Sequence, residues 1–149
     1  MALLYDDEAV NSHPEYGSAR LMRLKERDFL FSDTEMDSML GLMFLENKAN
    51  TMAYDYLIAW TLLRKDLARF AEVLSISPYQ VMPKSYQEAM ALYLALSQVN
   101  PDSFPAFVSE TVRMQLNNFI TAMNSGKNEG YMQTKFGHTY WFYYYYRYR

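Results

Sequence analysis

Hydrophobic residues recur along most of the chain with the three- to four-residue spacing of an amphipathic α-helix, and the alternation typical of strands is almost absent. The spacing begins in residues 18–31, after turn signals in 14–17, where apolar and basic positions are mixed. It is clearer in 33–47, which Ser32 or Asp33 can cap and whose apolar positions are Met36, Met39, Leu40, Met43 and Phe44. The pattern predicts an all-α protein whose first two helices lie in these segments.

The next segment, up to Leu63, is apolar on nearly every face, and Asn50 or Thr51 can cap it. A helix that is apolar all round is typically buried between neighbours, so we expect this one at the centre of the fold. Asp66 can cap a further helix over 67–74. Because two helices joined by so short a turn pack antiparallel, the pattern predicts a helical hairpin.

Two longer helices are predicted beyond the proline-containing connection that follows. Ser85 and Glu88 have the spacing of a capping box, and the helix they begin extends to about Val99. From Pro105 an apolar stripe continues through Phe119 to Met123 and ends in a polar, glycine-containing loop; its other members are Val108, Val112 and Leu116.

Sliding the sequence by 32 residues aligns the segment 54–63 with 86–95, placing Tyr54 over Tyr86 and Leu62 over Leu94. This period is close to the roughly 34 residues of tetratricopeptide repeats. Two interpretations stay open, since any two amphipathic helices align some apolar positions. The favoured architecture is a short tetratricopeptide-like solenoid of stacked antiparallel hairpins.

The length of 149 residues, half of them apolar, suits one domain with one core. We expect residues 1–32 to form an N-terminal segment with one short helix and residues 33–149 to form the helical-repeat domain.

Composition excludes several classes of function. The formal charge of −3 gives no general attraction for phosphate backbones, so we expect no nucleic-acid partner. The absence of cysteine excludes disulfides, thiolate catalysis and sulfur-ligated metals. The longest apolar runs, 56–63 and 89–96, fall short of the roughly 20 residues that a membrane-spanning helix needs. Residues 1–10 also lack the pattern of a signal peptide, so we expect no membrane insertion by this chain itself.

Nine aromatic rings lie within residues 136–149, for which a strand, a membrane-interface anchor and a short helix are the alternatives. A strand would have no alternating partner, and the two arginines make too narrow a basic face for an anchor. A helix capped by Thr139 that covers the end of the helical stack fits best. Its one side carries Trp141, Tyr144, Tyr145 and Tyr148. On the other side we expect partly exposed, candidate partner-binding residues: Tyr140, Tyr143 and Arg147.

Candidates for chemistry each have a simpler structural interpretation. The two histidines, His13 and His138, have no second ligand type at metal-binding spacing and fit turns better. Ser97 and Ser109 have no nucleophile signature around them, and the acidic run at 6–8 fits a solvated terminus. Trp60 and the methionines are expected to fill the core. We therefore expect no enzyme, cofactor or metal site.

Three stretches, "NTMAYDYLIAWTLLRKDLARF" (50–70), "SYQEAMALYL" (85–94) and "FGHTYWFYYYY" (136–146), resemble the C-terminal helical region of an uncharacterised family of Gram-negative bacterial proteins, a domain of unknown function. The resemblance covers roughly residues 40–149. It implies tetratricopeptide-like helical pairs and no known activity. In that family a membrane-spanning part precedes the soluble region, which implies that this chain is a fragment or a shortened relative and that a missing N-terminal region anchors it in the bacterial inner membrane.

Two functions follow as hypotheses. The favoured one is a protein-interaction or scaffolding module that binds a protein or peptide of unknown identity on its stacked helices. The alternative is a module that binds a carbohydrate or another small flat ligand by stacking on exposed aromatic rings. An enzyme is a remote third hypothesis.

Overall fold

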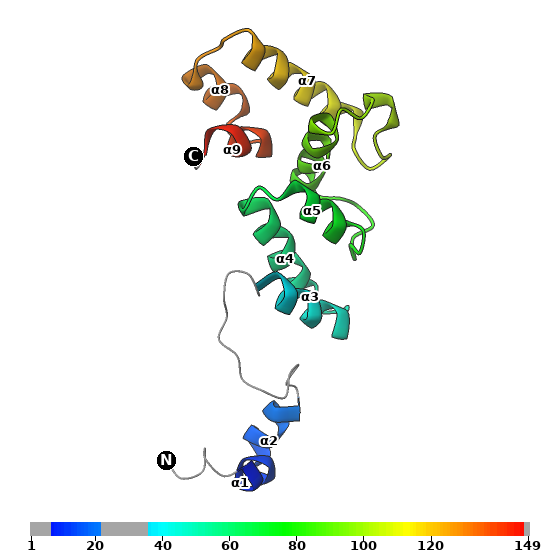
Figure 1. The fold of residues 1–149 in the computed structure, drawn as a ribbon, viewed down its shortest axis with the longest axis vertical. Helices are drawn as coiled ribbons and strands as arrows, with labels where there is room; N and C mark the ends of the chain where they lie inside the picture. The colour runs from blue at the N-terminus through cyan, green and yellow to red at the C-terminus, as the bar shows by residue number, and fades with distance from the viewer. Residues whose placement is uncertain (1–6, 22–35, 148–149) are drawn as a thin grey trace.

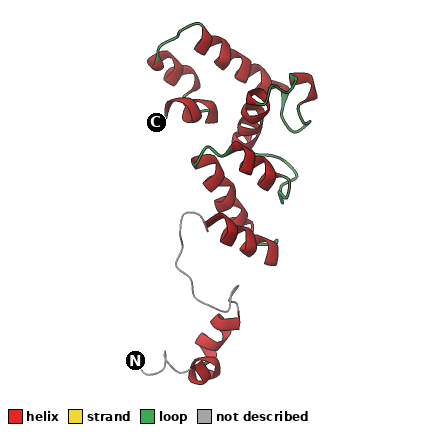
Figure 2. Ribbon diagram, viewed as in Figure 1, coloured by secondary structure: helices red, strands yellow, loops and turns green. Residues whose placement is uncertain are grey.

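A computed structural model describes residues 7–21 and 36–147, and all secondary structure in these two ranges is helical (Figure 2). The predicted all-α class is confirmed for this part of the chain. The elements are α1 (Asp7–Ser12), α2 (Pro14–Leu21), α3 (Met36–Glu46), α4 (Thr51–Leu63), α5 (Leu67–Leu74), α6 (Lys84–Leu96), the short 3-10 helix η2 (Pro101–Ser103), α7 (Glu110–Asn124), α8 (Glu129–Phe136) and α9 (Tyr140–Tyr146).

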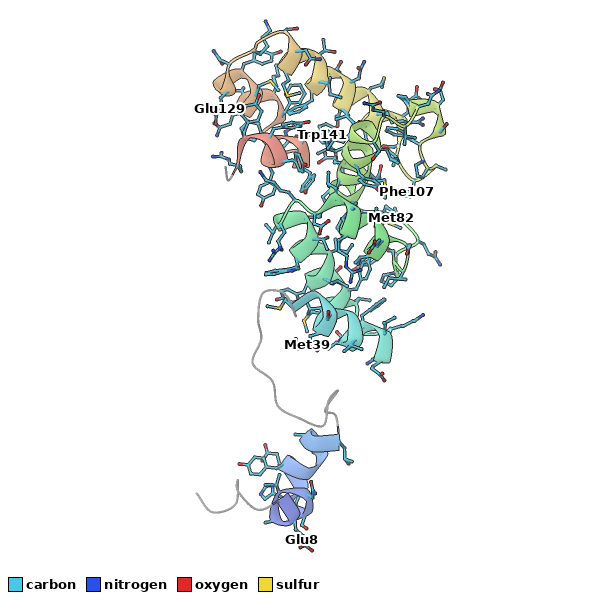
Figure 3. The ribbon with its side chains drawn as sticks, in the orientation of Figure 1. Glu8, Met39, Met82, Phe107, Glu129 and Trp141 are labelled. Carbon is cyan, nitrogen blue, oxygen red and sulfur yellow. The ribbon has the colours of Figure 1, made fainter. Side chains whose placement is uncertain are left out.

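From α3 to α9 each α-helix packs on the next one in the chain, and α9 returns to contact α6 (Figure 1). A single cluster of buried apolar side chains connects these helices, from Phe44 on α3 through Phe70 on α5 to Phe119 on α7. Met39 on α3, Phe107 ahead of α7 and Trp141 on α9 mark the course of the chain (Figure 3). The order of contacts makes α9 the element that joins the last helices to α6.

Two predicted helix caps are confirmed, and they fix where α4 and α5 begin. The side chain of Asn50 accepts a hydrogen bond from Ala53 N, and that of Asp66 accepts one from Arg69 N. Each bond satisfies a backbone N–H that has no partner within its own helix.

Three of the described helices end in the same hydrogen-bonding pattern, in which a residue just beyond the helix adopts a left-handed backbone. After α4, Lys65 has φ 60°, and Asp66 N donates to Thr61 O at 3.0 Å. Gln98 (φ 56°) after α6 and Gly126 (φ 68°) after α7 repeat this arrangement. The pattern gives hydrogen bonds to carbonyl groups at the helix ends. Glycine adopts the left-handed conformation most easily, because it has no side chain.

Replacing Gln98 by glycine should therefore stabilise the protein. An exposed side chain at a left-handed position strains the backbone, and removing it should raise the free energy of unfolding by about 0.5–1 kcal/mol, after the entropy cost of glycine is subtracted. Urea denaturation measures the change. Lys65→Gly is the matched control: the backbone relief is the same, but this lysine makes two hydrogen bonds to α9, so the variant should be less stable than the wild type. A destabilised Gln98→Gly protein would contradict the assignment of strain.

The N-terminal part differs from its prediction. The turn expected in 14–17 is instead the first turn of α2, because Pro14 stands at a helix start, where its missing N–H and fixed φ are tolerated. Of the helix expected in 18–31, residues 22–31 lie outside the described residues, as does the boundary drawn between residues 32 and 33.

Two of the later boundaries also differ from their predictions. The helix expected to reach Val99 ends at Leu96, where the left-handed Gln98 terminates it. The helix expected from Pro105 begins at Glu110, because Ser109 caps it by accepting a hydrogen bond from Val112 N. Val108 is still fully buried, from the loop ahead of α7.

The expectation that α4 is buried on every side is wrong. Its inner face buries Ala53, Tyr54, Leu57, Ile58 and Thr61. Its outer face leaves Met52, Tyr56 and Leu63 each 62% exposed. Hydrophobicity alone predicted a buried helix, but among the described elements only α3 and α5 pack extensively against α4, and two neighbours cover one face.

Candidate functional site

The aromatic segment at the end of the chain is a helix, α9, as predicted. The Thr139 hydroxyl accepts a hydrogen bond from Phe142 N at 3.3 Å, which confirms the predicted cap. Tyr140, Trp141 and Phe142 are buried, and the four tyrosines that follow are half-buried. The rings of this segment therefore serve mainly as packing surface between α9 and the helices before it.

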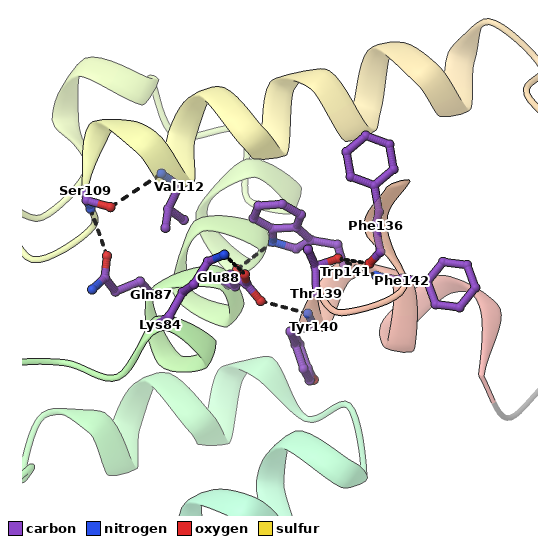
Figure 4. A network of polar contacts seen from close by, with 10 residues as sticks. All are labelled: Lys84, Gln87, Glu88, Ser109, Val112, Phe136, Thr139, Tyr140, Trp141 and Phe142. Atoms are coloured by element: carbon purple, nitrogen blue, oxygen red, sulfur yellow. Dashed lines mark hydrogen bonds and ion pairs between the residues drawn. The ribbon is translucent and has the colours of Figure 1, made fainter. Parts of the chain in front are cut away.

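The N-terminal end of α9 is held by Glu88 of α6 (Figure 4). This carboxylate is only 3% exposed and accepts a hydrogen bond from Tyr140 N at 2.8 Å. The backbone carbonyl of the same residue accepts one from Trp141 Nε1 at 2.9 Å, and Lys84 Nζ lies 3.6 Å from the carboxylate. One residue of α6 thus binds both the backbone and the indole of α9.

The predicted capping box of Ser85 and Glu88 is wrong. The helix begins at Lys84, with Pro83 as its N-cap and no side-chain bond there. Glu88 lies in the second turn of α6 and binds a helix more than fifty residues away in the chain. The local sequence contains no signal for this long-range contact.

The C-terminal end of α9 is held by Lys65, in the turn between α4 and α5. Its ammonium donates to Tyr144 O and to Arg147 O, both at 2.6 Å, and lies above the rings of Tyr143 and Tyr144. A carboxylate at the start of a helix and an ammonium at its end both complement the helix dipole. We call Glu88 and Lys65 together the α9 clamp.

The three tail residues proposed for partner binding are placed differently from one another. Tyr140 is only 9% exposed, so the expectation that it lies on the open side is wrong. Its hydroxyl donates to Leu62 O at 2.9 Å, and burial, followed by the neighbouring tyrosines, raises its pKa above the ordinary value. The reason for the error is that α9 packs its first turn, and not one complete side, against α4 and α6.

The other two residues lie together at the edge of α9. Tyr143 is half-buried and its hydroxyl donates to Leu63 O at 2.8 Å, while Arg147 is exposed and its guanidinium lies 5.5 Å from the centre of the Phe142 ring. Their part in binding a partner stays a prediction.

The exposed face of α4 leads to this edge. Met52, Tyr56 and Leu63 follow one another at helical spacing, with the exposed Ala59 between the last two. Since the Tyr143 hydroxyl bonds to the carbonyl of Leu63, the stripe continues to α9. We call Met52, Tyr56, Leu63, Tyr143 and Arg147 the α4–α9 surface. Hydropathy could not reveal it, because the same residues would also suit a core.

Trp60 lies beside this stripe and is half-buried, with the Arg64 guanidinium 5.3 Å from its ring. The sequence predicts it in the core, and this prediction is wrong. Trp141 is instead the fully buried tryptophan.

The remaining candidates lie at turns and helix ends. His13 Nδ1 accepts hydrogen bonds from Glu15 N and Tyr16 N, and its ring stacks on Tyr16. His138 is exposed in the turn before α9. The structure places the two candidate serines at helix termini, Ser97 after α6 and Ser109 before α7.

Metal-binding clusters and membrane-spanning helices are both absent from the described ranges, 7–21 and 36–147. These ranges contain no group of three or more His, Asp or Glu side chains placed to hold a metal ion. They also contain no helix long and apolar enough to span a membrane.

One polar pair stands out beside α4. The Tyr79 hydroxyl donates to the Asp55 carboxylate at 2.6 Å, and this hydrogen bond, together with partial burial, raises the pKa of Tyr79 to about 12. The bond ties the connection between α5 and α6 to α4 and gives that connection a fixed position.

Comparison with known proteins gives one match. A family model described as a family of unknown function (DUF6057) matches residues 1–147. The match includes the first 39 residues, which the resemblance noted in the sequence did not cover. No curated protein and no solved structure matches the chain.

Proposed function

The chain belongs to the DUF6057 family, whose function is unknown, and we propose that it is a non-catalytic protein-interaction or scaffolding module. The observation that carries the proposal is the α4–α9 surface, in which three large apolar side chains of one helix are 62% exposed. Contiguous exposed apolar residues on a folded protein are typical of interaction sites.

The partner that fits this surface is an amphipathic helix of another protein. The apolar positions follow one face of α4 over three turns, which is the contact that a second helix makes when it packs alongside. Arg147 and Arg64, at one end of the stripe, favour an acidic residue at the matching end of the partner.

A tetratricopeptide-like stack of antiparallel hairpins is part of this proposal. In its favour, α4 and α6 have 13 residues each and end in the same left-handed turn. Their offset is 33 residues, from Thr51 to Lys84, and not the 32 of the sequence alignment. The second helices of the two pairs differ, since α5 has 8 residues and α7 has 15.

Membrane anchoring stays a proposal that rests on the family resemblance alone. Its test is the reading frame upstream of Met1, in which apolar segments of about 20 residues would support an anchored protein. An upstream frame without such segments would contradict it.

Carbohydrate binding by the aromatic tail has less support. Sugar stacking needs an open ring face, and the first three rings of α9 are buried.

The test is the double variant Met52→Ser/Tyr56→Ser, which changes the α4–α9 surface without touching the core. Proteins that the wild-type chain captures from a lysate of the cells that produce it are purified. The affinity of each one for the wild-type chain and for the variants is then measured by titration. We expect the double variant to bind its partner about tenfold more weakly or worse. Val81→Ser, at an apolar residue that is 84% exposed elsewhere, is the matched control and should bind as the wild type does.

Equal binding of the partner by the double variant and by the control would overturn the proposal. It would also be overturned if no protein partner bound and the wild-type chain instead bound lipid vesicles, with this binding lost in the double variant. Circular dichroism of each variant confirms that the fold is unchanged.

A further inference from the structure

A concave site lies between the end of α6, the 3-10 helix η2 and one face of α7. It is a pocket of about 590 Å³, within the range of pockets that hold small molecules. Its apolar lining includes Val99, Phe104 and Ile120, and its polar lining includes Asp102, Glu110 and Arg113. The α4–α9 surface contributes none of the lining residues, so the two sites are separate.

Arg113 is the cation of this lining, and its hydrogen-bonding capacity is largely unused. One terminal nitrogen donates to Pro101 O at a long 3.4 Å. The Nε–H is shielded from solvent and has no acceptor among the described residues. Within the described residues the guanidinium makes no ion pair. A guanidinium keeps its charge under all ordinary conditions, and a shielded N–H without an acceptor is costly.

The two terminal nitrogens of this guanidinium form an edge that can donate two parallel hydrogen bonds to a carboxylate. The long contact with Pro101 O uses only part of this capacity. Within the described ranges no carboxylate pairs with the guanidinium, so this edge is available to the carboxylate of a ligand.

Two acidic side chains of the same lining are also without ion pairs in the described ranges. Asp102 belongs to η2 and Glu110 to the first turn of α7, and both are exposed. An anion alone would be repelled by them, whereas a ligand with its own positive group would be attracted. The pocket thus presents one positive group, two negative groups and an apolar floor.

We propose that this pocket binds a small apolar zwitterion, that is, a hydrophobic amino acid or short hydrophobic peptide with both termini free. Arg113 binds the carboxylate through its terminal nitrogens, Asp102 and Glu110 attract the ammonium group, and the apolar side chain packs on Val99, Phe104 and Ile120. A single amino acid and a short peptide both carry these three groups, and the titration below shows which of the two ligands binds. This site is independent of the proposed function.

The experiment titrates the full chain with leucine, phenylalanine and the dipeptide Leu-Phe, followed by NMR shifts of the α7 amides and by calorimetry. We expect one of the three to bind with shifts confined to α6, η2 and α7. N-acetylation or C-terminal amidation of that ligand should each weaken binding about tenfold or more, because acetylation removes the positive group that Asp102 and Glu110 attract and amidation removes the carboxylate that Arg113 binds.

Arg113→Gln should weaken binding by a similar factor, and Arg113→Lys should restore little, since an ammonium has no planar fork. Lys135→Gln, which removes an exposed positive charge from α8, is the matched control and should leave binding unchanged. Melting curves check that all three variants are folded. The double variant Met52→Ser/Tyr56→Ser should also bind normally, which keeps this test distinct from that of the α4–α9 surface.

Two results would overturn the proposal. One is the absence of α7 shifts with all three ligands. The other is equal binding of the blocked and free forms, which would make the pocket an apolar groove without charge recognition. Tight binding of the free amino acids alone would assign the site to single amino acids, and tighter binding of Leu-Phe would assign it to peptides.

Discussion

Trp141→Ala should destabilise the protein by about 3–5 kcal/mol, the range for removing a large aromatic side chain from a packed core. Trp141 is fully buried and contacts the ring of Phe119 on α7. Its indole N–H donates to the Glu88 carbonyl on α6, so the variant loses both packing and a hydrogen bond between α9 and the middle of the stack. Urea denaturation followed by circular dichroism measures the loss.

The chain provides its own control in the second tryptophan. Trp60 is half-buried on the outer side of α4, so Trp60→Ala should cost about 1 kcal/mol or less. If Trp141→Ala fails to fold, Trp141→Phe keeps most of the apolar volume and loses the N–H, and it should still be less stable than the wild type. Similar costs at both tryptophans would show that α9 does not belong to the core.

The sequence predicted local structure well, because local structure follows from neighbouring residues. The caps at Asn50, Asp66 and Thr139 were identified from residue type and position, and each accepts the expected backbone hydrogen bond. The helix in the aromatic tail was predicted by eliminating a strand without a partner. These inferences need no knowledge of the fold.

The sequence could not predict contacts between distant segments. Glu88 has the spacing of a capping box, yet it binds α9, and only the packing of α6 against α9 decides between these partners. Lys65 lies in the short turn between α4 and α5, and the residues around it do not indicate that its ammonium binds the end of α9. The residue type of an apolar side chain such as Tyr56 or Trp60 does not indicate whether another helix will cover it.

The candidate sites show the same difference between local structure, which the sequence predicts, and contacts between distant segments, which it does not. Arg113 and Glu110 are one turn apart on a helix, and their spacing alone does not predict a site, because their environment depends on η2 and the end of α6. Tyr140 was assigned to the open side from helical periodicity alone. A helix of seven residues that packs through its first turn has no simple inner and outer side, so periodicity misplaced it.

Removing the α9 clamp should show that α9 docks as one unit. Glu88→Ala leaves Tyr140 N without its buried acceptor and should cost about 1–3 kcal/mol, whereas Glu88→Gln keeps an acceptor and should cost less. Lys65→Met removes the two bonds to the carbonyls at the other end of α9 and should cost a similar amount. Urea denaturation of the three single variants and of Glu88→Ala/Lys65→Met provides the comparison.

The double variant distinguishes a cooperative contact from two separate ones. Glu88 and Lys65 bind opposite ends of α9, so they interact energetically only through that helix. Once either change releases α9, the other bond is already lost, and the cost of the double variant should be clearly smaller than the sum of the single costs. Hydrogen exchange should then show the α9 amides losing protection together in each single variant, while those of α4 keep theirs. Strict additivity, with α9 still protected, would mean that the two ends of the helix are held independently.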